Sequence, residues 1–268
     1  MVRLWSLLRR LLFQVEFYLR WKLRRFCNRK HTVIPLTLLI QFRNEADNLP
    51  GFFANACPQV SHIIALDDGS SDASATIAAA VSNLSLISKP PVTPHHWDEP
   101  GNKRLLINEA LLKAPCWILV LDADERLEQH FHERANLAIH LAMRYRFSSI
   151  ALRFGELWAD ISQVRIDGIW GKKRRACLFL LQHDYQLQSA DFHAGWNCAN
   201  KNTSEHVVSA DICFYHLGML TAAQRESRKL KYKQLDPDNQ WQSIGYDYLT
   251  DLHGLTLKKT PADRNFLE

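Results

Sequence analysis

Acidic side chains stand at the ends of apolar segments in this sequence. Asp67 closes one apolar segment, and Asp122 and Asp124 follow another. Carboxylates that gather with few bases nearby repel one another, so we expect a cation among them. Their oxygen atoms suit a hard divalent ion such as Mg²⁺ or Mn²⁺. Acids after strands also cap helices, an alternative that fits Asp72 better than the other three.

Short apolar runs that alternate with helical segments must position these side chains. We expect strands over 32–42, 60–68, 84–88 and 116–124, and helices over 48–56, 73–81 and 102–114. Beyond residue 125 we expect a helix over 127–144, strands near 148–154, 174–181 and 212–216, and a helix over 221–233. This alternation predicts a parallel sheet with helices on both faces. Such sheets bind ligands beyond the carboxyl ends of their strands, and the first strand ends in Gln41, Arg43 and Glu45.

Composition limits the class of protein. The 268 residues are 47% hydrophobic and 23% charged, values of a globular chain rather than a disordered one. The six cysteines form no CxxC pair, so we expect neither a zinc site nor a disulfide framework, and we expect a reducing, cytoplasmic compartment. Nine of the 33 Lys and Arg residues but one of the 28 acids lie in residues 1–31, so the remainder carries a net charge of −3. A nucleic-acid partner is therefore not expected.

The first thirty residues predict a basic amphipathic helix. Apolar residues recur at steps of three and four, with most of the arginines on another side, and the apolar set is Leu4, Leu8, Leu11, Leu12, Val15, Leu19, Leu23 and Phe26. No uncharged stretch here approaches the about 20 residues that a membrane span needs. Two interpretations stay open: an interfacial helix that touches a membrane through residues 1–28, or a helix packed on its own domain.

Three blocks carry a resemblance to a known family. FRNEADNLPGFF at 42–53, IIALDDGSSDAS at 63–74 and GNKRLLINEALLKAPCWILVLDADERLE at 101–128 resemble the nucleotide-sugar-binding half of family-2 glycosyltransferases. The resemblance implies the GT-A fold, a Rossmann-like α/β single-domain sandwich around a mostly parallel central sheet, here with an added N-terminal amphipathic helix. The LDADE form is especially similar to bacterial members that extend lipopolysaccharide cores or other surface glycans.

The resemblance also implies roles for individual residues. Asp67 matches a residue that hydrogen-bonds the base of the nucleotide, with Gln41, Arg43 and Glu45 bordering the same pocket. Asp122 and Asp124 match the DxD motif, where the first contacts ribose or metal-bound water and the second binds the metal, Mn²⁺ or Mg²⁺. A cation near the diphosphate corresponds to Lys103 or Arg104. The family often has a late histidine as third metal ligand, for which the candidates are His216 and, second, His193.

The catalytic base is not identified by the resemblance. Family-2 enzymes invert the anomeric centre by direct displacement, which needs a group that takes the proton of the acceptor hydroxyl. The family's acid pair ahead of an arginine is not evident, and the available groups are Asp167 and Asp191, then Asp160 and His193. Trp158 and Trp170 fit either an acceptor surface or the core. The basic run 172–175 fits either a solvated loop or a contact with an anionic ligand.

These observations predict a metal-dependent inverting glycosyltransferase. We expect residues 1–30 to form the basic helix, 31–233 the catalytic domain, with a donor half at 31–128 and an acceptor half at 129–233, and 234–268 a C-terminal extension. The donor would be a nucleotide sugar, with a UDP-sugar favoured by family frequency. The acceptor would be a glycan or glycolipid of bacterial surface polysaccharide or lipopolysaccharide synthesis, at the inner face of the membrane.

Two alternatives are kept. One is a non-catalytic homologue that binds nucleotide sugar or serves as an assembly partner, which the missing base motif favours. The other is a different enzyme that uses the same acids. A nucleotidyltransferase would need a Gly-rich loop after the first strand, where the sequence has Arg43 to Asp47 without glycine, and a nuclease would need a basic body.

Overall fold

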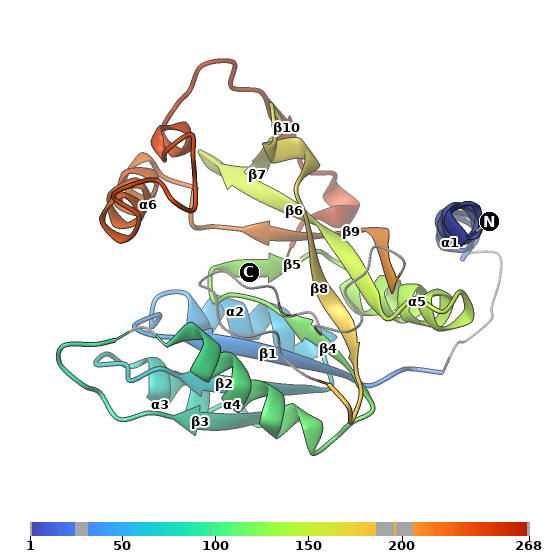
Figure 1. The fold of residues 1–268 in the computed structure, drawn as a ribbon, viewed down its shortest axis with the longest axis horizontal. Coiled ribbons are helices and arrows are strands. Elements are labelled where there is room, and N and C mark those ends of the chain that lie inside the picture. The colour runs from blue at the N-terminus through green and yellow to red at the C-terminus, as the bar shows by residue number, and fades with distance from the viewer. Residues whose placement is uncertain (1, 25–31, 97, 186–195, 197–205, 267–268) are drawn as a thin grey trace.

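The computed structural model describes residues 2–24, 32–96, 98–185, 196 and 206–266. Its centre is a sheet in which the described strands follow the order β10-β7-β6-β8-β4-β1-β2-β3, with β9 paired to β6 and β5 paired to β9 (Figure 1). Helices pack around this sheet, and the predicted α/β fold class is confirmed. The predicted alternation of strands and helices in the first half is also present.

The first half of the chain forms a parallel sheet. It contains β1 (Leu36–Phe42), β2 (His62–Asp67), β3 (Leu84–Ser88) and β4 (Cys116–Val120), and the pairs β1–β2, β1–β4 and β2–β3 are parallel. The helices between these strands are α2 (Leu49–Ala56), α3 (Ser74–Ala79) and α4 (Glu99–Leu111). Consecutive residues of β1 and β2, such as Leu38–Ile40 and Ile63–Leu66, are fully buried, because a parallel strand covered on both faces has no solvent side.

The second half adds strands of mixed direction. After β5 (Glu125–Leu127) and α5 (Phe131–Arg144) come β6 (Ser149–Trp158), β7 (Asp160–Arg165), β8 (Arg174–Leu181) and β9 (Val207–His216). β8 runs antiparallel between β4 and β6, whereas β9 is parallel to β6 and antiparallel to β5. α6 (Ala222–Leu235) follows β9, and the short β10 (Leu257–Lys259) pairs with β7.

Several element boundaries differ from those expected, and two of them decide where the DxD residues lie. The strand expected over 116–124 ends at Val120, since the chain turns at 122–125, where Glu125 donates its N–H to the carbonyl of Asp122. β5 then begins and pairs with β9, whose start at Val207 lies five residues ahead of the expected one. The turn brings the DxD residues beside the end of β9.

The residues after α6 pack against the sheet. Phe266 is buried against Tyr215 of β9, and Tyr246 and Leu249 are buried with Trp158 and Trp170. A buried charge cluster adds to this attachment, in which Arg264 donates to Glu128 at 2.7 Å.

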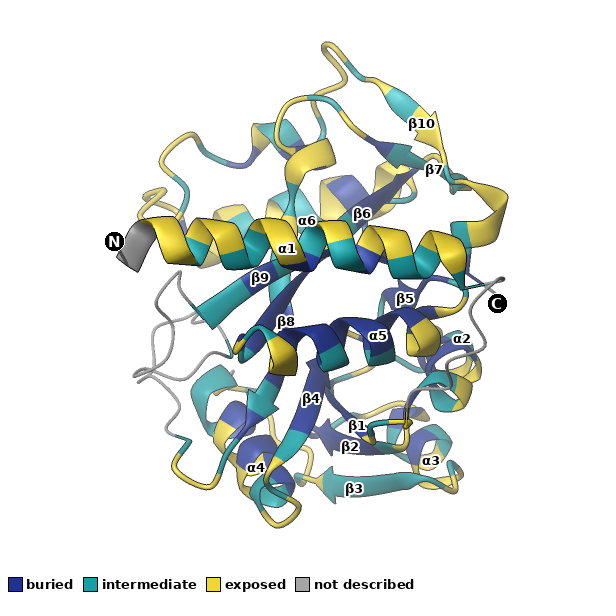
Figure 2. Cartoon of the chain, turned by 90° about the vertical axis from the view of Figure 1, so that its right-hand side faces the viewer, coloured by how far each residue is buried: buried dark blue, intermediate teal, exposed yellow. Residues whose placement is uncertain are grey.

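Helix α1 (Val2–Leu23) lies on α5 and β9 through two buried phenylalanines, Phe13 and Phe17. The leucines of the expected apolar stripe point the other way and are exposed, as Figure 2 shows along the length of the helix. Searched over the described residues, no helix has the length and apolar character that a membrane crossing requires. Phe26, the last member of the stripe, lies outside the described residues.

Candidate active site

The carboxyl ends of β1, β2 and β4 lie at one edge of the sheet. Phe42 pairs with Asp67 across β1 and β2, and Leu39 pairs with Val120 across β1 and β4. Parallel pairing therefore brings the loops that carry Gln41–Glu45, Asp67 and Asp122–Asp124 to the same side, as the sequence predicts.

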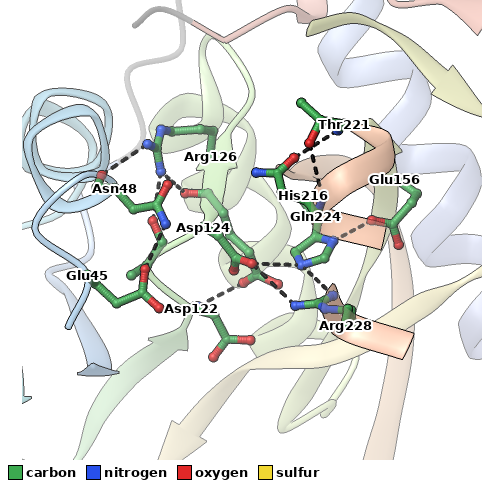
Figure 3. Close-up of polar contacts among 12 residues, drawn as sticks. Glu45, Asn48, Asp122, Asp124, Arg126, Glu156, His216, Thr221, Gln224 and Arg228 are labelled. Carbon is green, nitrogen blue, oxygen red and sulfur yellow. Dashed lines mark hydrogen bonds and ion pairs between the residues drawn. The ribbon is translucent and has the colours of Figure 1, made fainter. Parts of the chain in front are cut away.

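Asp124 meets His216 at this edge. Glu125 of β5 pairs with His216, the last residue of β9. Asp124, which directly precedes Glu125, therefore lies beside His216. Oδ2 of Asp124 lies 3.0 Å from Nε2 of His216. The other ring nitrogen, Nδ1, pairs with Oε1 of Glu156, the residue opposite His216 on β6 (Figure 3). His216 is thus held between two carboxylates.

The charges of this group stabilise one another. Burial alone would lower the pKa of His216, but the carboxylates of Glu156 and Asp124 raise it to about 10. Burial alone would raise the pKa of Asp124, but the positive charges of His216 and Arg228 hold it well below its ordinary value. Asp124 is therefore ionised throughout the physiological range.

The donor set fits a divalent cation. Asp124 offers a carboxylate oxygen, the ligand type that Mn²⁺ and Mg²⁺ prefer, and His216, 3.0 Å away, would offer Nε2 once a cation has displaced its proton. Glu156 holds Nδ1 of His216 and so orients Nε2 toward Asp124, the usual support for a metal-binding histidine. In the part of the chain that the structure describes, no group of three or more His, Cys, Asp or Glu residues is arranged to hold a metal. A cation here would take its remaining ligands from the diphosphate and water.

Asp122 lies at the open side of the same turn. Its side chain is largely exposed, and its backbone N–H donates to the buried carboxylate of Glu125 at 2.9 Å. Arg175 of β8 donates to Glu125 at 2.8 Å and lies 3.5 Å from Asp122. Burial raises the pKa of Glu125, and the positive charge of Arg175 opposes that rise. Glu125 and Arg175 therefore fix the turn that presents Asp122.

Arg228 of α6 contacts both Asp124 and His216. Its Nη2 donates to Oδ2 of Asp124 at 3.4 Å, and its Nη1 lies 3.0 Å from Nε2 of His216 (Figure 3). α6 begins at a capping box in which Thr221 and Gln224 bond each other's backbone N–H, and this fixes where the helix starts. Sequence reasoning missed Arg228, because no motif marks a base that follows the last strand by twelve residues.

Gly218 was also missed. A Cβ at this position would lie 2.5 Å from Oδ2 of Asp124 and 2.8 Å from Nε2 of His216. Both distances are shorter than real Cβ atoms tolerate, so a side chain here would displace the pair. A glycine two residues after a candidate histidine was the available signal, since it permits such a close approach of the backbone.

Asp67 lies at the end of β2 and is buried. Its Oδ1 accepts hydrogen bonds from the backbone N–H of Ser70 at 2.9 Å and from the Ser70 hydroxyl at 2.5 Å. On β1 and just after it, Oε1 of Gln41 and Nε of Arg43 are buried without a hydrogen-bond partner among the described residues. Buried polar atoms without partners are costly, and a polar ligand would satisfy them. These atoms lie where the resemblance places the nucleotide pocket.

The loops after β1 and β2 are tied together. The backbone N–H of Asn44 donates to Ser70 at 3.0 Å, and that of Ser71 donates to Oδ1 of Asn44 at 2.8 Å. Asn44 adopts a positive φ of 55°, a conformation that asparagine tolerates better than most residues. These bonds hold the two loops of the pocket in one arrangement.

Glu45 faces the acids from the first loop. Asn48 donates to its carboxylate at 2.7 Å (Figure 3). Burial raises the pKa of Glu45, and the negative charges of Asp124 and Asp122 add to that rise against the hydrogen bond from Asn48. Glu45 is thus electrostatically coupled to the DxD pair, although no direct contact joins them.

The expected cations on α4 differ in position. Lys103 is buried and pairs with Glu99 at 2.6 Å, whereas Arg104 is exposed. Near the end of β2, Asp68 pairs with Lys89 at 2.9 Å and with His95 at 3.0 Å. His95 therefore ties the loop after β3 to the end of β2.

The candidate bases are not brought to the metal ligands in the described structure. Asp167 accepts two hydrogen bonds from Arg165, and these bonds lower its pKa, so it is a poor proton acceptor. Asp160 is exposed on β7 and bonds Ser162. Asp191 and His193 lie outside the described residues.

Two further sequence alternatives are decided by burial and contacts. Trp158 and Trp170 are buried side by side, with ring centroids 5.8 Å apart, so they belong to the core and form no acceptor surface. In the run 172–175, Lys172 is exposed, but Lys173 lies 3.8 Å from the centre of the Trp170 ring and Arg175 pairs with Glu125. The run is therefore not simply a solvated loop.

Comparisons with known proteins agree with the resemblance. Residues 37–138 match the family model for glycosyl transferase family 2. No curated protein matches the chain. A crystal structure of a mycobacterial protein aligns at 13% identity and a TM-score of 0.41, over 75% of this chain and 74% of that one. Glucosyl-3-phosphoglycerate synthase from Mycobacterium tuberculosis, in complex with Mn²⁺ and UDP-glucose, aligns at 12% identity and a TM-score of 0.40, over 85% of this chain and 87% of that one.

Structural similarities at these TM-scores support no inference about this chain. The family match is independent of them and covers β1 to β4, the DxD turn and the start of α5, where the quoted motifs lie. Residues 37–138 therefore form a domain of the glycosyl transferase family 2 type, and over this region the chain is similar to glycosyltransferases.

Proposed function

We propose that the protein is a metal-dependent, inverting glycosyltransferase that uses a nucleotide-sugar donor, with a UDP-sugar favoured. The observation that carries this proposal is the approach of Asp124 to His216, at 3.0 Å, beside the open ends of β1, β2 and β4. An oxygen and a nitrogen donor with a supporting carboxylate fit Mn²⁺ or Mg²⁺ held against a diphosphate.

The residues divide the donor between them. Asp67, Gln41 and Arg43 would bind the nucleoside, with Glu45 bordering the same pocket. Asp122 would bind ribose or a water molecule of the metal, while Asp124 and His216 would hold the cation. When bound, the cation neutralises the negative charge that develops on the departing nucleoside diphosphate. Arg228, 3.4 Å from Asp124, supplies a second positive charge on the same side. Arg104 remains the exposed candidate on α4 for the diphosphate.

The proton acceptor is proposed to be Asp191 rather than Asp167. Asp167 is committed to Arg165, which stabilises its ionised form and weakens it as a base. Exchange of Asp191 for Asn should abolish transfer to acceptor while donor binding remains. If D167N and D191N lost transfer activity equally, the loss in D191N would not identify Asp191 as the base.

Donor and acceptor are proposed to bind to different halves of the sheet. In this proposal residues 31–128 bind the donor, residues 129–233 bind the acceptor, and residues 234–268 brace the acceptor half through Arg264, Tyr246 and Phe266. The acceptor would be a glycan or glycolipid of bacterial surface polysaccharide or lipopolysaccharide synthesis. The enzyme would act at the cytoplasmic, inner face of the membrane, in peripheral contact through residues 1–28, which the basic composition of that segment supports.

A non-catalytic homologue is the second candidate. It is favoured by one observation, that the described residues place no free carboxylate of Asp160 or Asp167 near Asp124. Such a protein would bind donor without turning it over.

A nucleotide screen tests the proposal. We expect UDP or another nucleoside diphosphate to raise the melting temperature with Mn²⁺ present but not with a chelator. A ligand at one hundred times its dissociation constant adds about 2.7 kcal/mol to the free energy of unfolding. Slow donor hydrolysis with Mn²⁺ that disappears in D124N would support the enzyme. Binding without any hydrolysis or transfer would support the non-catalytic homologue, and no response to any nucleotide would contradict both.

A further inference from the structure

The outward face of α1 is mostly apolar, with the exposed Lys22 near its C-terminal end. Residues at steps of three and four are exposed along it, with 73% of Leu4, 64% of Leu7 and 60% of Leu11 open to solvent. The remaining members of this face, which we name the α1 ridge, are Trp5, Leu8, Leu12, Val15, Tyr18, Leu19 and Leu23. Among the described residues, no other segment covers the ridge (Figure 2).

The inward face of α1 is the polar one. Only Phe13 and Phe17 are fully buried against the domain. Between them Glu16 accepts a hydrogen bond from Tyr145 at 2.6 Å and from Arg144 at 2.8 Å, so α5 holds the helix by its acid. A surface helix normally turns its apolar side to its own core and its polar side to water. In α1 the leucines face water, and of the large apolar residues only Phe13 and Phe17 are fully buried. The ridge therefore does not pack the helix on its own domain.

The size of the ridge points to a partner. Soluble monomers rarely expose a contiguous apolar patch along a whole helix, and such patches mark contacts with proteins or membranes. With 22 residues at 1.5 Å each, α1 is about 33 Å long and offers its ridge as a flat strip. A fixed strip of this kind fits a planar surface.

Charge distinguishes a membrane from a second copy of the chain. α1 contains Arg3, Arg9, Arg10, Arg20 and Lys22 against the single acid Glu16, which is already paired within the chain. Two α1 helices packed ridge to ridge would bring two segments of high positive charge within about 10 Å of each other. A bilayer with anionic headgroups would instead attract them, and Trp5 and Tyr18 are residue types that favour the boundary between headgroups and acyl chains.

We infer that the α1 ridge lies in the interface of an anionic lipid bilayer, with the leucines in the acyl boundary and the helix parallel to the surface. This inference rests on the proposed membrane location and adds the surface responsible for it. Because the inner face of α1 is bonded to α5, the whole catalytic body is oriented with the helix rather than tethered loosely to it.

Flotation of the full-length protein with vesicles tests the inference. The probes are vesicles of phosphatidylcholine alone and of phosphatidylcholine with phosphatidylglycerol. We expect binding to the mixed vesicles to be at least about tenfold tighter than to the neutral ones. The double variant L11E/V15E should lose this binding, whereas L112E, which places one carboxylate at a leucine 79% open to solvent at the end of α4, should keep it. Bromine-labelled lipids should quench tryptophan emission in the wild type, and less in W5F.

Other outcomes would overturn the inference. Equal binding of L11E/V15E and the wild type would exclude the ridge, as would an absence of binding to anionic vesicles. A vesicle-independent dimer that L11E/V15E converts to a monomer would assign the ridge to a second copy instead. UDP binding with Mn²⁺, measured without vesicles on the same samples, reports on folding and on the proposed function separately. Its retention in L11E/V15E shows that a loss of flotation is not a loss of structure.

Discussion

Asp124 connects three parts of the chain at the scale of single residues. It belongs to the turn after β4, it faces His216 at the end of β9, and it accepts a hydrogen bond from Arg228 of α6. Strong opposite charges on both sides lower its pKa, so its ionised form does not depend on a bound ion. The carboxylate is therefore ready to bind a cation at neutral pH.

Exchange of Asp124 for Asn should remove metal-dependent catalysis. The amide keeps the shape of the side chain but neither pairs with His216 as an ion nor binds a divalent cation well, so we expect at least about a hundredfold loss of Mn²⁺-dependent donor hydrolysis. Hydrolysis of radiolabelled donor measures it. D160N, which changes an exposed acid on β7, is the control and should retain activity. Similar rates in D124N and the wild type would refute the role of Asp124.

Gly218 tests the same site through its backbone. In G218A the new Cβ would approach Oδ2 of Asp124 to 2.5 Å, so the carboxylate or the loop must move. We expect weaker binding of UDP with Mn²⁺, by about tenfold or more, in calorimetric titrations. G254A is the control, because no atom lies within 4 Å of the Cβ position of Gly254, although its positive φ of 70° makes alanine the more strained residue there. Equal effects of the two changes would assign the loss to general destabilisation.

The residues that sequence reasoning found and missed differ in one physical respect. Asp67, Asp122 and Asp124 end apolar strands, and the carboxyl edge of a parallel sheet follows from strand order alone. His216 was identified as a candidate on the resemblance, and the structure brings it to Asp124. Arg228 and Arg175 were not assigned to the site, because their contacts depend on where α6 and β8 lie, which no local pattern determines.

At the scale of elements, α1 is attached to the domain by the partly buried acid Glu16. Burial alone would raise the pKa of Glu16, but hydrogen bonds from Tyr145 and Arg20 and the positive charge of Arg144 lower it. A carboxylate with a lowered pKa in the folded state stabilises that state above its unfolded pKa, near 4.3 to 4.5, and loses this contribution as the pH falls below it.

The variant E16Q should therefore loosen α1 at neutral pH only. Because the partners are partly exposed, we expect about 1 kcal/mol less stability than the wild type at pH 7 and a difference that shrinks toward zero below pH of about 4. Urea unfolding at several pH values measures the free energy, and limited proteolysis near residue 24 reports the release of the helix. E133Q changes an exposed acid of α5 and should show no such pH dependence. A difference that grew on acidification would contradict the assignment.

The segment after α6 is attached by a buried acid. Glu128 is fully buried and pairs with Arg264 at 2.7 Å and with Arg134 at 2.9 Å. In R264A the carboxylate would lose one of these two partners, and we expect a loss of about 2 kcal/mol in the free energy of unfolding. The control K258A removes an exposed charge from β10 and should change stability little. Equal stability of R264A and the wild type would show that this segment contributes nothing to the fold.

The elements themselves were largely predictable. Apolar runs gave β1, β2, β3 and β4, because strands that are buried on both faces are continuously apolar. The position of β8 between β4 and β6, and the parallel pairing of β9 with β6, could not be predicted. These pairings join residues far apart in sequence, and a mixed sheet allows several strand orders with the same apolar pattern.

At the scale of the whole molecule, α1 and α6 lie at opposite ends of the longest axis (Figure 1). An enzyme docked through the α1 ridge would then hold its metal ligands on the side away from the bilayer. α1 contacts β9, but no described residue of α1 is bonded to Asp124, His216 or Arg228, so strong coupling between the two sites is not expected. We therefore predict that saturating anionic vesicles leave the affinity for UDP and Mn²⁺ unchanged to within about twofold. A large loss of affinity on vesicles, seen by equilibrium dialysis, would indicate that the bilayer blocks the pocket.

The central claim is that a divalent cation binds between strand β9 and the turn after β4. Crystals grown with Mn²⁺ and UDP, measured at the manganese absorption edge, test it most directly. The account predicts one strong anomalous peak in coordination contact with Asp124, His216 and the diphosphate. An anomalous map with UDP bound but manganese absent from that position, or bound elsewhere, would contradict it.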